Sequence, residues 1–311
     1  MNDVAPLARK FRIARYWRRT WPLHMLLIPA LVLSLVYQYT PIVLSFPMAF
    51  QEYQPWLGLR GSPWVGLDHF RYLFTYPQSK QVIVNTLLIS TLKIATQLTV
   101  PVLFALLLNE LRNMLFKRAV QTLVYLPHFM SWVILGGILT DLLSIQDGLI
   151  NRLLVELGFE PIFFLADGDW FRFTVIVSDI WKEFGFSAII FLAAIAGINP
   201  SLYEAAEIDG AGRWKQTLYV TVPGIAPIFT VVAALSMGRV LDGGYDQILN
   251  LYNPLVMAKG DIIDTFVYRV GLQSGYFSFG TAVGLFKSAI GFILIVAAYR
   301  LAYKYANYRI F

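Results

Sequence analysis

Three charged residues lie close together in one apolar stretch of the sequence. Asp179, Lys182 and Glu183 are spaced so that all three side chains fall on one side of a helix. Two interpretations stay open for them: an internal ion pair that fixes helix packing, or a polar lining for a hydrated solute. Because the lysine lies between the two carboxylates, the pattern favours charge pairing over the separate acid and base of an enzyme.

Two further lysines and two tryptophans belong with this group. Lys93 and Lys287 interrupt other apolar stretches, and charges in such places usually face a cavity or a partner. Trp132 and Trp181 offer the flat aromatic faces that sugar rings need. These four residues and the three above are our candidates for lining a solute path. Three basic against two acidic residues is too small an excess to indicate an anionic solute.

The sequence lacks the motifs of disulfide, metal-binding and nucleotide-binding sites. The chain has no cysteine, which excludes disulfides and thiolate metal sites. His24, His69 and His128 are far apart and form no metal-binding pattern, so we predict no metal site and no catalytic residues. A phosphate-binding loop is absent as well, because Lys287-Ser288, the nearest imitation, lacks the required glycines.

The composition indicates a membrane protein. Of the 311 residues, 57% are hydrophobic and only 14% are charged, against about 25% charged in a typical soluble domain. So few charges could not cover the apolar core of a soluble fold of this size.

Six apolar stretches reach the roughly 20 residues that a membrane-spanning helix needs. They cover residues 22–49, 82–108, 119–140, 173–198, 216–238 and 280–303. The first has no cleavage site, so we expect it to be retained. The sequence predicts an all-α integral membrane protein with a cytoplasmic basic segment over residues 1–20 and a single transmembrane domain over 21–311.

The distribution of basic residues predicts the orientation. With a cytoplasmic N-terminus, the inner segments hold 14 basic residues in 59 positions and the outer segments hold 8 in 103. Lysine and arginine concentrate on the cytoplasmic side of membrane proteins. We therefore expect both termini in the cytoplasm, and the net charge of +6 needs no nucleic-acid partner. The outer segments 51–80, 141–172 and 239–279 either cap the helix bundle or contact an external partner.

One inner loop predicts a short exposed helix between the fourth and fifth spans. Asn199 suits an N-cap, Pro200 suits the first helical position, and Gly210 suits the turn after Asp209. Such a helix is a compact knob that could sit in a groove of another protein. From composition alone, a plain helical linker is the alternative.

This loop resembles the EAA signature of binding-protein-dependent ABC-importer permeases. Glu204-Ala205-Ala206 is followed by Asp209-Gly210-Ala211 and then by Val222-Pro223 at the family's spacing. The chain is most similar to the oligosaccharide and polysaccharide (LplB-like) branch, which includes a permease subunit of the alginate importer. Further stretches with this similarity are Leu106–Glu110, Tyr125–Phe129, Ser178–Trp181, Asn253–Leu255, Val267–Arg269 and Ala282–Ser288.

The resemblance implies six transmembrane helices and a permease subunit, not an enzyme, in the bacterial inner membrane. The EAA helix is the coupling helix of that family, so Glu204, Ala205, Ala206, Asp209 and Gly210 are expected to dock on an ATPase. Implied partners are a second, different permease, two ATP-binding subunits that hold ATP and Mg, and an external solute-binding protein. The substrate would be an oligosaccharide or polysaccharide fragment, and this chain would carry no cofactor.

Two rival functions remain: a membrane-embedded enzyme acting on glycans or lipids, and a stand-alone secondary sugar transporter. Neither needs a docking helix. The sequence does not specify the sugar or the outer loop that would contact a binding protein.

Overall fold

The computed structural model describes residues 20–306 of the 311. Regular structure in this range is helical, apart from one antiparallel bridge between Gln51 and Trp64. The predicted basic segment over residues 1–20 lies almost wholly outside the described residues. Chain contacts define two compact units that divide between His69 and Phe70, and each unit is described on its own below.

The first unit holds one long apolar helical run, Thr20–Phe50, where a span over 22–49 is predicted. A π-helical turn, η1 (Leu35–Tyr39), precedes α2 (Thr40–Ser45), and the 3-10 helix η2 (Phe46–Phe50) ends the run. The wider turn falls directly before Pro41, whose ring nitrogen cannot donate the usual helix hydrogen bond. After α3 (Gly58–Gly61), the chain returns to Phe50, whose carbonyl accepts from Val65 N at 2.9 Å.

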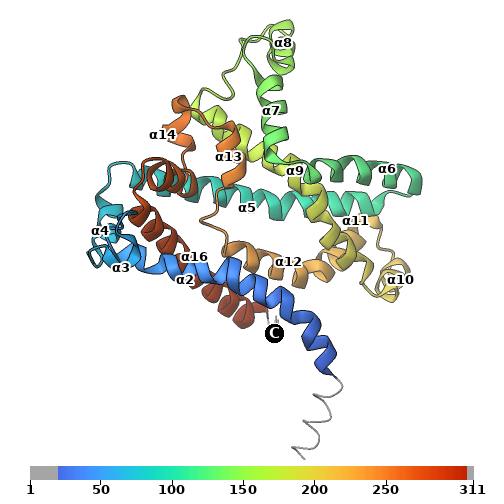
Figure 1. Cartoon of the computed structure of the whole chain (residues 1–311). Coiled ribbons are helices and arrows are strands. Elements are labelled where there is room, and N and C mark those ends of the chain that lie inside the picture. The colour runs from blue at the N-terminus through green and yellow to red at the C-terminus, as the bar shows by residue number, and fades with distance from the viewer. Residues whose placement is uncertain (1–19, 307–311) are drawn as a thin grey trace, which may run out of the picture. The chain divides into compact units, whose positions relative to one another are not determined.

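The second unit contains the remaining candidate spans (Figure 1). The division between the units falls inside the short helix α4 (Asp68–Thr75). The long helices are α5 (Ser79–Glu110), α9 (Gly168–Ala196), α12 (Val222–Met237) and α16 (Phe277–Ala306). Shorter elements are α6 (Met114–Tyr125), η3 (Leu126–Phe129), α7 (Trp132–Leu143), α8 (Leu149–Glu156), α10 (Pro200–Ile208), α11 (Arg213–Gln216), η4 (Thr217–Thr221), α13 (Tyr245–Leu251), η5 (Pro254–Val256), α14 (Met257–Gly260), α15 (Ile263–Phe266) and η6 (Val267–Gln273).

Helices α5 and α9 form the most extensive contact, and α12 packs against both of them and against α16. Buried apolar side chains fill these contacts: Ala105 from α5, Phe191 from α9 and Ile225 from α12 belong to one cluster. Outward-facing side chains are also apolar, as Phe292 and Ile293 of α16 show by remaining more than 60% exposed. A surface of this kind suits lipid. Four helical runs among the described residues are long and apolar enough to cross a membrane: Thr20–Phe50, Ser79–Glu110, Arg213–Met237 and Phe277–Arg300. The number is six if two bent pairs, α6 with α7 and α9 with α10, each count as one span.

The predicted third span is not one straight helix. Instead of a continuous helix over 119–140, α6 with η3 and then α7 form a pair bent by 104°. Pro127 lies in the 3-10 turn, and Ser131 begins α7 by accepting from Ile134 N at 3.3 Å. Proline and a serine N-cap are both signals that end one helix and start another.

Two close helix contacts depend on glycine. A Cβ atom at Gly185 of α9 would lie 2.4 Å from Val124 Cγ1 and 2.5 Å from its carbonyl oxygen in α6. A Cβ atom at Gly280 of α16 would lie 2.9 Å from the Cα of Gly271 in η6, whereas Gly284 faces open space. Small residues allow helices to approach this closely in membranes.

Candidate functional site

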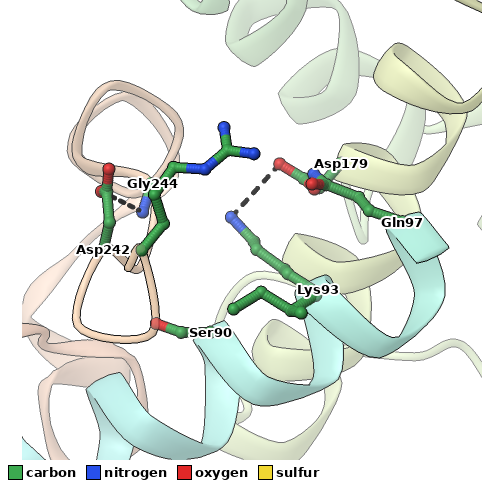
Figure 2. Close-up of a pocket in the computed structure, with 8 residues that line it drawn as sticks. Ser90, Lys93, Gln97, Asp179, Asp242 and Gly244 are labelled. Atoms are coloured by element: carbon green, nitrogen blue, oxygen red, sulfur yellow. Dashed lines mark hydrogen bonds and ion pairs between the residues drawn. The ribbon is translucent and has the colours of Figure 1, made fainter. Parts of the chain in front are cut away.

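Lys93 and Asp179 meet inside the packed pair of helices α5 and α9. Lys93 Nζ lies 3.4 Å from Asp179 Oδ1, and the two side chains are only 6% and 11% exposed. Figure 2 shows both residues pointing toward one another across a small cavity. Because the pair joins two helices, it fixes their relative register.

Neighbouring groups form further hydrogen bonds with both members of this pair. Lys93 Nζ also donates to Gly243 O at 2.9 Å and to the side-chain oxygen of Gln247. Gln97, one turn after Lys93 on α5, donates to Asp179 Oδ2 at 2.6 Å. Both charges of the pair therefore have close partners.

The loop before α13 has to approach Lys93 closely. Gly244 has φ of +88°, which strains any residue with a side chain, and a Cβ atom there would displace Lys93 Nζ, only 2.6 Å away. Gln247, fully buried, then ties α13 to α9 by donating to Val175 O at 2.7 Å and Ser178 Oγ at 2.8 Å. The cavity beside this network has a volume of about 140 Å³ and is also lined by Ser90, Arg239 and Asp242.

Lys182 and Glu183 of α9 belong to a separate cluster. Lys182 Nζ lies 2.9 Å from Glu183 Oε1 and donates to His128 O at 2.8 Å. Glu183 Oε2 also lies 2.7 Å from His128 Nδ1, and Lys182 sits 5.7 Å above the ring of Trp132. These contacts connect α9 to the bend between α6 and α7 and stabilise it. The sequence predicts Asp179, Lys182 and Glu183 on one side of a helix. In the structure Asp179 instead pairs with Lys93 of α5, apart from the other two.

Lys287 has yet another environment. Its ammonium group lies 2.5 and 2.7 Å from the two carboxylate oxygens of Asp264 in α15. Burial raises the pKa of the Asp264 carboxyl above its ordinary value, although the Lys287 ammonium acts in the opposite direction. A cavity of about 450 Å³ borders this pair and is lined by Tyr245, Tyr268 and Asp242. Asp242 therefore lines both this cavity and the one beside Lys93.

The seven residues predicted to line a path thus do not form a single site. Two lysines, Lys93 and Lys287, border cavities that share Asp242. Trp132 joins Lys182 and Glu183 at the helix bend, whereas Trp181 is 43% exposed and takes part in neither cluster. Sequence reasoning missed the partners of these charges: Gln97, His128, Gln247 and Asp264. Gln97 could have been found, because it follows Lys93 at helical spacing.

Helix α10 has the features expected of the exposed helix. Asn199 accepts from Ser201 N at 3.1 Å as an N-cap, and Gly210 adopts φ of +73° directly after the C-cap Asp209. Glu204, Ala205 and Asp209 are exposed, and Ala206 is half-buried. On the same surface Leu202 and Ile208 are 53% and 87% exposed. Acidic and apolar side chains are thus presented together on a rigid helix.

These features define a class of protein, an all-α integral membrane protein with polar cavities between its helices and one short exposed helix. The chain belongs to the family described as binding-protein-dependent transport system inner membrane component, whose model matches residues 97–307. It is therefore a permease subunit of an ABC importer, a multi-pass protein of the bacterial inner membrane. The predicted all-α membrane fold and the predicted family are confirmed. ATP hydrolysis in this family resides in separate subunits, so the chain itself is not an enzyme.

Two relatives from Bacillus subtilis (strain 168) are similar over nearly the whole chain. The polygalacturonan/rhamnogalacturonan transport system permease protein YteP is 46% identical, over 92% of this chain and 88% of the relative. Protein LplB is 41% identical, over 93% of this chain and 90% of the relative.

Solved structures show the same fold. A crystal structure of a bacterial ABC transporter that imports the acidic polysaccharide alginate contains a chain with a TM-score of 0.86 and 37% identity. That similarity covers 94% of this chain and 99% of the other. A second structure shows a bacterial alginate ABC transporter in complex with an alginate pentasaccharide-bound periplasmic protein, at a TM-score of 0.85 and 36% identity.

Proposed function

We propose that this permease forms one side of a translocation path for a saccharide delivered by an external solute-binding protein. The observation that carries the proposal is α10, a rigid and exposed helix with the EAA residues on its surface. Such a helix suits docking in a groove of an ATPase subunit. The partners that follow from this assignment are a second permease chain and two ATPases, which hold ATP and Mg.

The saccharide class rests on the relatives. YteP carries polygalacturonan and rhamnogalacturonan in its name, and the structural neighbour imports alginate. More distant relatives, 26% identical, are named for arabinooligosaccharides and for lactose. The relatives that cover nearly the whole chain favour an oligosaccharide or polysaccharide fragment as the substrate.

Within the chain, we assign the path to the two cavities that share Asp242. Lys93 and Asp179 border one of them and Lys287 borders the other, where Tyr245 and Tyr268 supply aromatic faces. Trp132, Lys182 and Glu183 are assigned to the support of the helix bend. This division refines the predicted set of path residues.

Reversing the charge on Glu204 tests the docking role. We expect Glu204→Lys to lose most of the co-purified ATPase and nearly all ATP-dependent saccharide uptake in proteoliposomes. Glu156→Lys is the matched control, since Glu156 is an exposed glutamate on α8, and it should retain both.

Two outcomes would contradict the proposal. Normal substrate-stimulated ATP hydrolysis by Glu204→Lys would remove the docking role from α10. Saccharide transport by this chain alone, without ATP, would show that the chain is a secondary transporter instead.

A further inference from the structure

A third cleft, outside the two cavities described above, lies where α5 and α9 begin. It has a volume of about 400 Å³ and is lined by Lys80, Arg172 and Lys259 together with the amides Gln81 and Asn85. Among the described residues, no carboxylate lines it. The cleft therefore combines three cationic side chains with neutral hydrogen-bonding groups.

Neutral oxygen atoms hold the guanidinium group of Arg172 in place. Arg172 Nε donates to Lys259 O at 2.8 Å, and Nη2 donates to Asn85 Oδ1 at 2.5 Å. Asn85 is itself oriented, because its Nδ2 donates to Ala258 O at 3.2 Å and to Asp261 O at 3.1 Å. The fork of Arg172 is thus fixed before any ligand arrives.

The charge of Arg172 is not neutralised by these contacts. Within residues 20–306, no carboxylate forms an ion pair with it, although the side chain is partly buried. A partly buried charge without a counter-charge is costly. A ligand carboxylate would supply that counter-charge, and a guanidinium fork matches a carboxylate with two parallel hydrogen bonds.

Lys80 and Lys259 add charge to the same cleft. Lys80 is the second residue of α5 and is exposed, and the described part of the chain gives it no hydrogen bond or ion pair. A cation in the first turn opposes the helix dipole, so helix stability does not explain it. Lys259 pairs with Asp169, yet 42% of its side chain remains exposed.

The cleft and the proposed docking helix lie at opposite ends of α9. Arg172 lies near the start of α9, whereas α10 follows its end, and Figure 1 shows α14 and α10 near these two ends. A helix of 29 residues is about 43 Å long at 1.5 Å per residue, enough to cross a bilayer. With α10 in the cytoplasm, the cleft lies near the external side, where a substrate would arrive.

We propose that this cleft binds a carboxylate of an acidic saccharide, a uronate-containing oligomer, at the external mouth of the permease. The assignment rests on the proposed function and narrows its substrate class. Arg172 binds the carboxylate, Lys80 and Lys259 attract it, and the Gln81 amide lies beside the sugar. Asn85 holds Arg172 in position.

The test uses the whole transporter, with its binding protein, in proteoliposomes of neutral lipid. Uptake is measured for a panel of oligouronides and for the same oligomers with their carboxylates reduced to alcohols. We expect Lys80→Gln and Arg172→Gln to lower oligouronide uptake roughly tenfold, the loss expected for one charge-assisted contact. Lys80→Gln is the more informative variant, because it removes no contact within the described residues.

Arg152→Gln is the control, since it removes an exposed positive charge on α8 that pairs with Asp147 outside the cleft. Wild-type uptake by Lys80→Gln would overturn the assignment, and so would an equal loss for the charged and reduced oligomers. A loss seen only in vesicles that contain phosphatidylglycerol would assign these cations to a lipid headgroup instead. A wild-type complex that imports only reduced oligomers overturns the acidic class alone, whereas one that imports no saccharide overturns the proposed function.

Discussion

The ammonium group of Lys93 finds three oxygen partners within the helix packing: the Gly243 carbonyl, the Gln247 amide and the Asp179 carboxylate. Buried charges are tolerated only where such partners replace water. Gln97 donates to the second oxygen of Asp179, so both carboxylate oxygens have a partner. At the scale of residues, the pair contributes first to the packing of α5 and α9.

Replacing one member of this pair should therefore lower the free energy of unfolding more than replacing both. Lys93→Met leaves Asp179 buried without its cation, so we expect the free energy of unfolding to fall by about 3 kcal/mol. Adding Asp179→Asn removes the unpaired charge and should recover most of that loss. Unfolding by SDS titration in mixed micelles measures both.

Lys117→Met, in α6, is the control for the loss of a lysine and should change the free energy of unfolding by less than about 0.5 kcal/mol. Equal losses in Lys93→Met and in the double variant would contradict the pairing.

The sequence identified the charges but not their partners. Lys93, Asp179, Lys182, Glu183 and Lys287 stand out because charges are rare in apolar stretches. Gln247 and Asp264 come from loops whose path the hydrophobic pattern does not encode. Their contacts depend on tertiary geometry, such as the left-handed backbone at Gly244 that brings α13 against Lys93.

At the scale of elements, the long apolar runs predicted the helices well, because length and hydropathy alone identify a potential span. Helix α5 covers the stretch predicted over 82–108, and α9 covers most of 173–198. The bend between α6 and α7 was missed, since a bent pair has the same composition as a straight helix. Pro127 and Ser131 were the local signals that could have indicated it.

The glycine contacts make a prediction at this scale. Gly280→Ala places a Cβ atom 2.9 Å from the Cα of Gly271, and backbone cannot yield as a flexible side chain does. We expect it to lower the free energy of unfolding by about 1–3 kcal/mol, a typical cost of overpacking. The shift should appear as a lower midpoint in thermal unfolding of the purified protein.

Gly284→Ala provides the comparison one helical turn away. Its Cβ atom would meet no atom within 4 Å, and alanine is the better helix former, so stability should be unchanged or slightly higher. A larger loss at Gly284 than at Gly280 would mean that a partner outside this chain contacts that face of α16.

At the scale of the whole molecule, the orientation stays a prediction from the basic residues. The absence of cysteine makes it simple to test by site-directed labelling. Glu160→Cys lies in a segment predicted to be external, and Arg112→Cys lies in one predicted to be cytoplasmic; both positions are exposed. We expect a membrane-impermeant maleimide to label Glu160→Cys in spheroplasts and Arg112→Cys only after the membrane is permeabilised.

The cysteine-free wild type gives the background for this experiment. The reverse labelling pattern would place α10 outside the cell and would separate it from any ATPase.

Helix α9 packs closely against α6 at Gly185, between the cleft near its start and α10 beyond its end. A rigid rod held at an intermediate point behaves as a lever with a fulcrum. If α9 tilts about Gly185, its two ends move in opposite directions while its backbone hydrogen bonds stay intact. A displacement of α10 that tilts α9 would thus also move Arg172, near the start of α9, at the cleft.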